Sequence, residues 1–185
     1  MTAQWTVTGA GVAILAREGT GPVITHATIG KAIDMGQSDA QDMGATMAPA
    51  AADTITRHFL DTARSPDYYD MVVTGDLGVY GKRLAELLIK KSGYDLSGRF
   101  TDCGILIYNK AHDVHAGGSG CGCSAVVTCG YLMGQLKSGS CKRFIGVGRR
   151  ILNHYQRGVI GSFYHTESGV RIDLIQCFDP SLMRY

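Results

Sequence analysis

Eight consecutive positions, 117–124, carry only glycine, serine and cysteine, in the order GGSGCGCS. An apolar stretch of small residues follows at once and has the composition of a buried helix. A glycine-rich turn at the start of a helix directs free backbone N–H groups outward, and the helix dipole favours negative charge there. This pattern predicts either a site for an anionic group or a tight packing turn, and the residues alone leave both interpretations open.

A second turn, at 75–78 (GDLG), ends the apolar run YDMVVT at 69–74. In α/β folds, ligands bind beyond the carboxyl ends of parallel strands, which is where we expect this turn. Asp76 is the nearest ionisable group. Its carboxylate either faces a ligand or caps the helix that follows, because aspartate accepts hydrogen bonds well from the free N–H groups of a helix start.

The cysteines of the first turn suggest two further kinds of chemistry. A cysteine at a helix start can have a lowered pKa and act as a nucleophile, but no histidine adjoins Cys121 or Cys123 in sequence to serve as a base. A metal site would draw on Cys121, Cys123, Cys129, His112 and His115. A C-x-C pattern without a second spaced pair is not a zinc pattern. We expect no catalytic residue, no metal and no cofactor, and reduced cysteines that serve as small apolar side chains.

The composition is that of a globular domain. The chain has 185 residues, 45% of them hydrophobic and 18% charged, with 25 glycines and a net charge of +2. This mild charge gives no indication of a nucleic-acid partner. No apolar stretch has the length of a membrane helix, and the N-terminus lacks the basic start and apolar run of a signal peptide.

Apolar patterns alternate between strand and helix along the chain, which predicts an α/β layered fold. A β-hairpin is expected from residues 4–15 and 23–33, joined by the turn REGTGP. The later elements are expected as a helix at 43–63, a strand at 69–74, a helix at 80–91, a strand at 100–108, a loop at 109–120, a helix at 121–137 and a strand at 142–147.

The helix expected at 121–137 has almost no polar face, which is typical of a helix buried on all sides. Gly130 and Gly134 lie four residues apart and would let another element approach closely. In a globular protein this pattern indicates a central layer with a sheet on each side. We expect a mixed sheet with a buried central helix.

The last part of the chain, 149–185, differs in character. It contains arginine but no lysine, whereas residues 1–148 contain both. A strand is possible at 170–177, without an evident partner. We therefore divide the chain into a domain at 1–148 and a divergent tail at 149–185.

Six stretches within residues 2–148 carry a resemblance to a known family: TAQWTVTGAGVAIL, ATIGKAIDMG, MGATMAPAAADTI, YYDMVVTGDLG, FTDCGILIY and AGGSGCGCSAVVTCGYLM. The chain resembles the C-terminal half of the stage V sporulation protein AD family, which is thiolase-like and occurs in spore-forming bacteria. The resemblance implies half of an αβαβα sandwich, with the helix from Cys121 in its central layer. It also implies binding of dipicolinic acid for uptake into the developing spore, by an assembly with other stage V sporulation A-type membrane proteins.

The chain departs from the wider thiolase-like pattern at the positions where acyl-condensing relatives carry their catalytic residues. In acyl-condensing relatives the nucleophilic cysteine lies in the N-terminal half, which this sequence does not match. Histidine or asparagine residues of those relatives correspond here to the turn at Asp76 and to Gly118-Ser119-Gly120. Nothing after Gly148 resembles the family, and with the change from lysine to arginine this predicts a shift of reading frame near that residue.

We therefore expect a non-catalytic module that binds dipicolinic acid. The expected ligand-binding residues are Gly75, Asp76, Leu77, Gly78, Gly118, Ser119, Gly120 and Cys121. The alternatives are an acyl-CoA condensing or thiolytic acyltransferase that needs an N-terminal half, and an inactive truncated fragment. The expected partners are that N-terminal half or a homodimer mate, and the expected location is the cytoplasm or forespore, peripheral to the spore inner membrane.

Overall fold

The computed structural model describes residues 1–31, 33–39, 41–109, 111–152, 157–165 and 171–174. The strands are β1 (Trp5–Thr6), β2 (Val23–Ile24), β3 (Met71–Thr74), β4 (Phe100–Asp102), β5 (Gly118–Ser119), β6 (Arg143–Leu152), β7 (Arg157–His165) and β8 (Arg171–Leu174). The helices are α1 (Met43–Thr62), η1 (Pro66–Tyr68), α2 (Gly78–Lys91), α3 (Cys103–Leu106), α4 (Cys121–Val126), η2 (Val127–Leu132) and α5 (Met133–Ser138).

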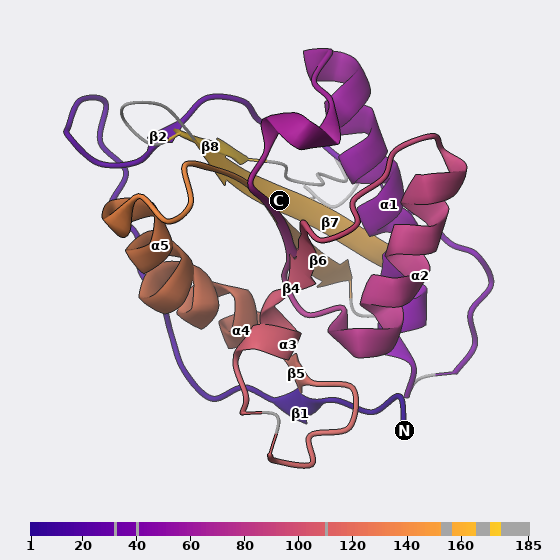
Figure 1. Ribbon diagram of the computed structural model, residues 1–185. Helices are drawn as coiled ribbons and strands as arrows, with labels where there is room; N and C mark the ends of the chain where they lie inside the picture. The colour runs from indigo at the N-terminus through magenta and orange to yellow at the C-terminus, as the bar shows by residue number, and fades with distance from the viewer. Residues whose placement is uncertain (32, 40, 110, 153–156, 166–170, 175–185) are drawn as a thin grey trace, which may run out of the picture.

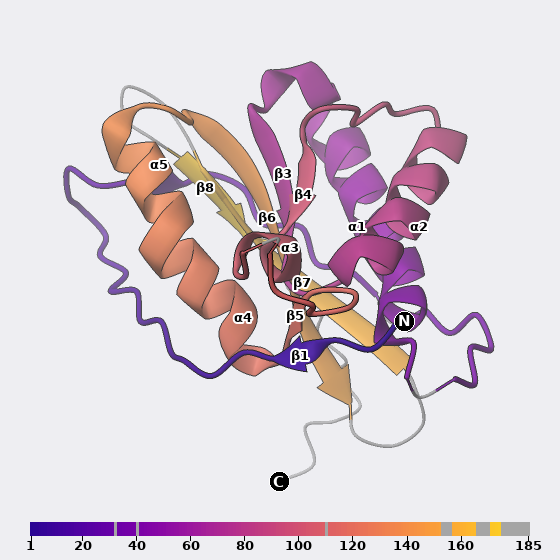
Figure 2. The same cartoon turned by 60° about the horizontal axis from the view of Figure 1, so that its bottom comes forward.

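Helices cover both faces of one mixed sheet, as Figures 1 and 2 show. Within the described residues this sheet has the strand order β2-β8-β7-β6-β3-β4. Strand β3 is parallel to β4 and β6, and β7 is antiparallel to β6. Helices α1 and α2 lie on one face, and the continuous helix formed by α4, η2 and α5 lies on the other. The predicted α/β class is confirmed.

Helix α1 begins where the sequence predicts, because Asp42 caps it by accepting a 2.9 Å hydrogen bond from the Ala45 amide. Its inner face buries Ile55 and Phe59 against the sheet core. The spacing of apolar residues in the sequence predicts that Leu60 shares this face, but Leu60 is 62% exposed, so that prediction is wrong. A proline is best tolerated in the first turn of a helix, and the sequence predicts that place for Pro49, but it lies further inside the helix. Helix α2 starts at Gly78, two residues before the predicted position.

The predicted hairpin of residues 4–15 and 23–33 is wrong. Strand β1 pairs in parallel with β5, with Trp5 opposite Gly118, and β2 pairs with β8. The reason is close packing against the α4 helix: a Cβ at Gly9 would lie 2.7 Å from Cγ2 of Val126, and one at Gly11 would collide with the Ala125 carbonyl oxygen. The glycines thus hold this segment along the helix instead of against the strand at 23–24.

Several predicted strand boundaries also differ from those observed. The strand expected at 100–108 ends at Asp102, and a short helix, α3, follows because the Asp102 carboxylate caps it through the Gly104 amide at 2.9 Å. The strand expected at 142–147 continues to Leu152 as β6. The strand considered at 170–177 is described as Arg171–Leu174, and it pairs with β2 and β7. Residues 175–177 lie outside the described residues.

The helix at 121–138 is buried on one face only, which corrects the expectation of burial on all sides. Cys123, Val127 and Leu136 face the core, whereas Tyr131 is 50% exposed. Nothing lies within 4 Å of a Cβ built on Gly130 or Gly134 among the described residues, so no described element makes the predicted close approach there. The physical reason is that the described residues place a large sheet on one side of this helix only.

None of the described helices combines the length and the apolar content that crossing a bilayer would require.

Candidate functional site

The two predicted turns meet at Asp76. Its Oδ2 accepts a 3.0 Å hydrogen bond from the Gly120 amide and a long one, 3.5 Å, from the Ser119 hydroxyl. Asp76 is buried, with only 5% of its surface exposed. Asp76 thus caps the start of α4, which is distant in sequence. Within the described contacts, an internal carboxylate occupies the anion-favouring end of the α4 helix.

A second buried carboxylate, that of Asp102, accepts hydrogen bonds from the turn at 75–78. Its Oδ2 accepts from the Thr74 hydroxyl at 2.7 Å and from the Leu77 amide at 2.8 Å. Its Oδ1 accepts from the amides of Gly78 at 3.0 Å and Gly104 at 2.9 Å. One side chain therefore satisfies free N–H groups at the starts of two helices, α2 and α3.

Asp102 is not among the site residues predicted from the sequence. The signal that could have indicated it is its position at the end of a strand parallel to β3, where the register pairs Thr74 with Asp102. Parallel neighbours end at the same sheet edge, so the carboxylate lies beside the turn at 75–78.

Burial, with a smaller contribution from the nearby charge of Asp76, raises the pKa of Asp102 to about 7, against the lowering effect of the hydrogen bonds from Thr74 and the Leu77 and Gly78 amides. The protonated form keeps its partners. The Thr74 hydroxyl also lies 3.3 Å from the Thr101 carbonyl oxygen, so it can donate there and accept the Asp102 proton. Asp102 therefore changes its charge close to neutral pH, inside the fold.

The N-terminal segment forms hydrogen bonds with both turns. The Gln4 side-chain amide donates 3.0 Å hydrogen bonds to the carbonyl oxygens of Asp76 and Gly118. The Val7 amide donates to the Ser119 carbonyl oxygen at 2.7 Å. Gly78 adopts φ +68, and a side chain there would collide with the Gln4 amide and the Ala116 carbonyl, so this position requires glycine. Gln4 is a further residue that the sequence analysis missed.

The structure brings the predicted site residues together. Cys121 is excepted, because its side chain lies outside the described residues. The amides of Leu77, Gly78 and Gly120 donate to Asp102 and Asp76. Gly75 packs against Ser124, with 3.5 Å between a built Cβ and the Ser124 Cβ. Their role as ligand contacts remains a proposal.

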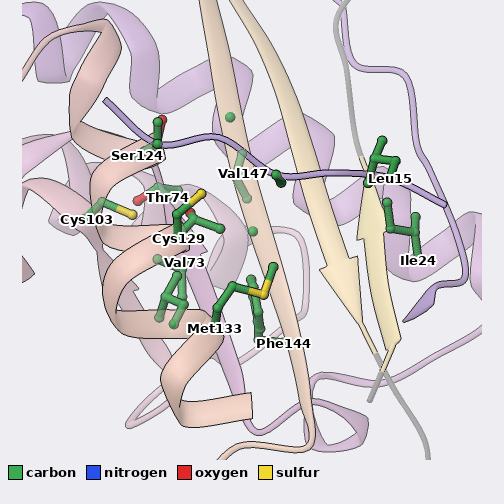
Figure 3. A pocket seen from close by; sticks show the side chains of 18 residues that line it. Leu15, Ile24, Val73, Thr74, Cys103, Ser124, Cys129, Met133, Phe144 and Val147 are labelled. Carbon is green, nitrogen blue, oxygen red and sulfur yellow. The ribbon is translucent and has the colours of Figure 1, made fainter. Parts of the chain in front are cut away.

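A cavity of about 380 Å³ lies between the α4 helix and strands β3 and β6, and Gly75 is part of its lining. In Figure 3, Ser124, Cys129 and Met133 project from the helix side, and Leu15 and Ile24 lie on the other side. Gly75 is the residue that the cavity shares with the predicted site. The lining consists of Gly11, Ala13, Leu15, Ile24, Val73, Thr74, Gly75, Cys103, Ser124, Ala125, Thr128, Cys129, Leu132, Met133, Phe144, Gly146, Val147 and Gly148.

The cavity is largely apolar, with hydroxyl groups from Thr74, Ser124 and Thr128 as its main polar features. No charged side chain of the described residues belongs to its lining. The cavity can therefore hold a flat or apolar group and offer it hydrogen bonds, but it supplies no fixed charge from the described residues.

The thiols of this region suit packing better than nucleophilic chemistry. Cys103, Cys123 and Cys141 are buried thiols and Cys129 is a half-buried one, and none of these four forms a disulfide. Burial, together with the charges of Asp102 and other neighbours, raises the pKa of the Cys103 thiol well above its usual range. A protonated thiol is a poor nucleophile. Within the described part of the chain, no three histidine, cysteine or acidic side chains are arranged to hold a metal ion.

Comparison with known proteins identifies the family. The family model described as stage V sporulation protein AD (SpoVAD) matches residues 1–155, a few residues beyond the predicted resemblance over 2–148. Stage V sporulation protein AD of Bacillus subtilis (strain 168) is 46% identical over 142 residues, which are 77% of this chain and 42% of that protein. The chain thus spans about two fifths of the length of this curated relative. The chain belongs to the stage V sporulation protein AD family.

Proposed function

We propose that this chain acts in sporulation as a non-catalytic module that binds dipicolinic acid, and that its fold is the C-terminal half of a thiolase-like sandwich. The family match supports the sporulation role. The helix–sheet–helix layering supports the fold assignment.

The observation that carries the binding proposal is the cavity at Gly75. It lies over the carboxyl-terminal half of β3 and the parallel stretch of β6, the end of a parallel sheet at which ligands bind. An aromatic ring would pack on Val73 and Phe144, and ligand carboxylates would accept hydrogen bonds from Ser124 and Thr128. Dipicolinic acid combines a flat ring with two carboxylates, so its ring suits the apolar walls and its carboxylates suit the hydroxyl donors.

The exposed face of the α4–α5 helix supports the proposal that a partner completes the site. Gly130, Tyr131 and Gly134 lie on this face, where the described residues leave the helix uncovered. We propose that the N-terminal half of the family protein covers it, or a second copy of this chain. The whole assembly would include other stage V sporulation A-type membrane proteins and lie at the forespore membrane.

Equilibrium dialysis with dipicolinic acid tests the binding proposal. Cys129→Phe adds bulk to the cavity wall, and Tyr131→Phe, on the exposed face of the same helix, is the matched control. We expect saturable binding by the wild-type chain and the control, and at least tenfold weaker binding by Cys129→Phe. Equal binding by all three proteins would place the ligand elsewhere.

One observation favours a second candidate function, acyl-group binding for an acyltransferase reaction. The cavity wall contains Leu132, Met133 and Phe144, which suit an acyl chain. This function needs a nucleophile from an N-terminal half. Acyl transfer from a thioester by the two halves together, and none by either alone, would support it.

A further inference from the structure

A cationic cluster lies near the start of β6, on the face of the sheet opposite the cavity. Two guanidinium groups stack on one aromatic ring: Cζ of Arg64 lies 4.5 Å from the centroid of Tyr68, and Cζ of Arg143 lies 4.6 Å from it. Arg64 also donates to Nδ1 of His26 at 3.2 Å and to the Tyr69 hydroxyl at 3.4 Å. All of these groups except the Tyr69 side chain are half-buried.

The fold places these residues firmly. Arg64 follows Ala63, the left-handed cap of α1, and its amide donates to the Phe59 carbonyl oxygen at 3.2 Å. Tyr68 ends the η1 turn just before β3. Arg143 begins β6, and its amide donates to the Asp70 carboxylate at 2.8 Å. Three separate backbone anchors therefore fix the positions from which the side chains converge.

Strand alternation separates this cluster from the cavity. Phe144 lines the cavity on the helix α4 side of the sheet. Its neighbour Arg143 stacks on Tyr68, which follows α1 on the other side, because successive side chains of a strand point to opposite faces. The register also pairs Arg143 with Arg171 of β8, so a further arginine backbone lies beside the cluster.

The charge of Arg143 is not neutralised by its described surroundings. The Asp70 carboxylate accepts hydrogen bonds through Oδ2 from the backbone amides of Lys142 and Arg143. Asp67 forms its ion pair with Arg99 at 2.9 Å. The Arg143 guanidinium has no hydrogen-bond acceptor or carboxylate partner among the described residues. Stacking uses only the flat face of a guanidinium, so its N–H donors remain free at the edge.

We propose that Arg143 and Arg64, held on Tyr68, form a binding site for a phosphate group. The two guanidinium groups are pre-oriented by the ring they share, and a guanidinium edge matches two phosphate oxygens in a bidentate arrangement. A dianion also offsets the repulsion between two neighbouring positive groups. This site is separate from the proposed dipicolinic acid cavity and does not rest on it.

Titration of the full chain with inorganic phosphate at pH 8 tests this site. The readout is the NMR signal of the arginine Nε–Hε groups, with sodium chloride at matched ionic strength as the reference. We expect a saturable phosphate-dependent shift of the Arg143 signal that chloride does not produce. We expect Arg143→Gln to weaken phosphate binding at least tenfold.

Arg83→Gln is the matched control, because Arg83 is an exposed arginine of α2 whose loss changes the net charge equally. This variant should bind phosphate like the wild type. Arg143→Lys keeps the charge but loses the planar fork, and we expect it to bind more weakly than the wild type. Equal phosphate affinity in the wild type and both Arg143 variants, or no saturable shift in the wild type, would overturn the proposal.

Discussion

At the residue scale, Asp102 has the most consequences for the fold. It has no exposed surface, and it accepts hydrogen bonds from one hydroxyl and three backbone amides. No cationic side chain is among these partners. Burial without a counter-charge disfavours ionisation, so the proton on this carboxyl is retained to unusually high pH.

We predict that Asp102 makes the protein less stable as the pH rises from about 4 to about 7. The folded state holds the Asp102 proton until its raised pKa of about 7, whereas the unfolded chain releases it near the ordinary value of 3.8. Between these pH values the folded state binds more protons, so the free energy of unfolding falls with rising pH by a few kcal/mol. Urea unfolding across this pH range measures the slope.

Asp102→Asn removes the contribution of Asp102 to the pH dependence of the free energy of unfolding. The amide keeps the shape but cannot ionise, and it loses the hydrogen bond from the Leu77 amide, which costs about 1–3 kcal/mol at all pH values. The free energy of unfolding of the wild type minus that of the variant should fall steadily as the pH rises from 4 to 7. A difference that stays constant from pH 4 to pH 7 would show that Asp102 does not titrate in this range.

At the element scale, Ala63 ends α1 in a left-handed conformation, with φ 52. A residue with a Cβ is strained there, by about 1–2 kcal/mol. We predict that Ala63→Gly raises the free energy of unfolding by about 0.5–1 kcal/mol, after allowance for the greater freedom of glycine in the unfolded chain. Thermal melting compares it with Ala51→Gly, in the buried middle of the same helix, which should lower stability by at least about 1 kcal/mol. Destabilisation by both would contradict the cap assignment.

The helices α1 and α2 cross at two glycines. A Cβ on Gly81 would lie 2.6 Å from the Gly44 Cα, whereas one on Gly134 in α5 would meet nothing within 4 Å among the described residues. We predict that Gly81→Ala lowers the free energy of unfolding by about 1–3 kcal/mol. Gly134→Ala should raise it by up to about 1 kcal/mol, because alanine favours helix. Chemical denaturation of the two variants checks the opposite signs, and equal effects would contradict the described crossing.

The range of the signals explains which elements were predictable from the sequence and which were not. Helix α1 was predictable because local signals, the Asp42 cap and the spacing of Ile55 and Phe59, agree with its packing. The hairpin prediction failed because the turn at 17–22 is a local signal, while the contacts of Gly9 and Gly11 with the α4 helix are long-range. The predicted glycine turn and Asp76 do meet, but the roles of Gln4 and Asp102 depend on strand register, which a single sequence does not display.

At the scale of the whole molecule, apolar side chains remain exposed on the N-terminal segment and on the α4–α5 helix. Val12 and Ile14 are 86% and 94% exposed, and Tyr131 is 50% exposed. Extended exposed apolar surface favours association. We predict concentration-dependent self-association of the isolated chain in sedimentation velocity, reduced in Tyr131→Lys. A monomer at all concentrations would contradict an open interface on this face.

The same face links the proposed partner to the proposed ligand. The α4–α5 helix contributes Ser124 and Thr128 to the cavity and carries Tyr131 on its exposed side. A partner that covers Tyr131 would hold this helix against the sheet. We therefore expect the N-terminal half to tighten ligand binding without contacting the Arg143 cluster.

Calorimetric titration of dipicolinic acid into this chain, alone and mixed with a separately made N-terminal half of the family protein, is the decisive test of the proposed binding function. We expect saturable binding that strengthens when the N-terminal half is present and that Cys129→Phe weakens at least tenfold in both cases. No binding of dipicolinic acid in either case would contradict the proposed function.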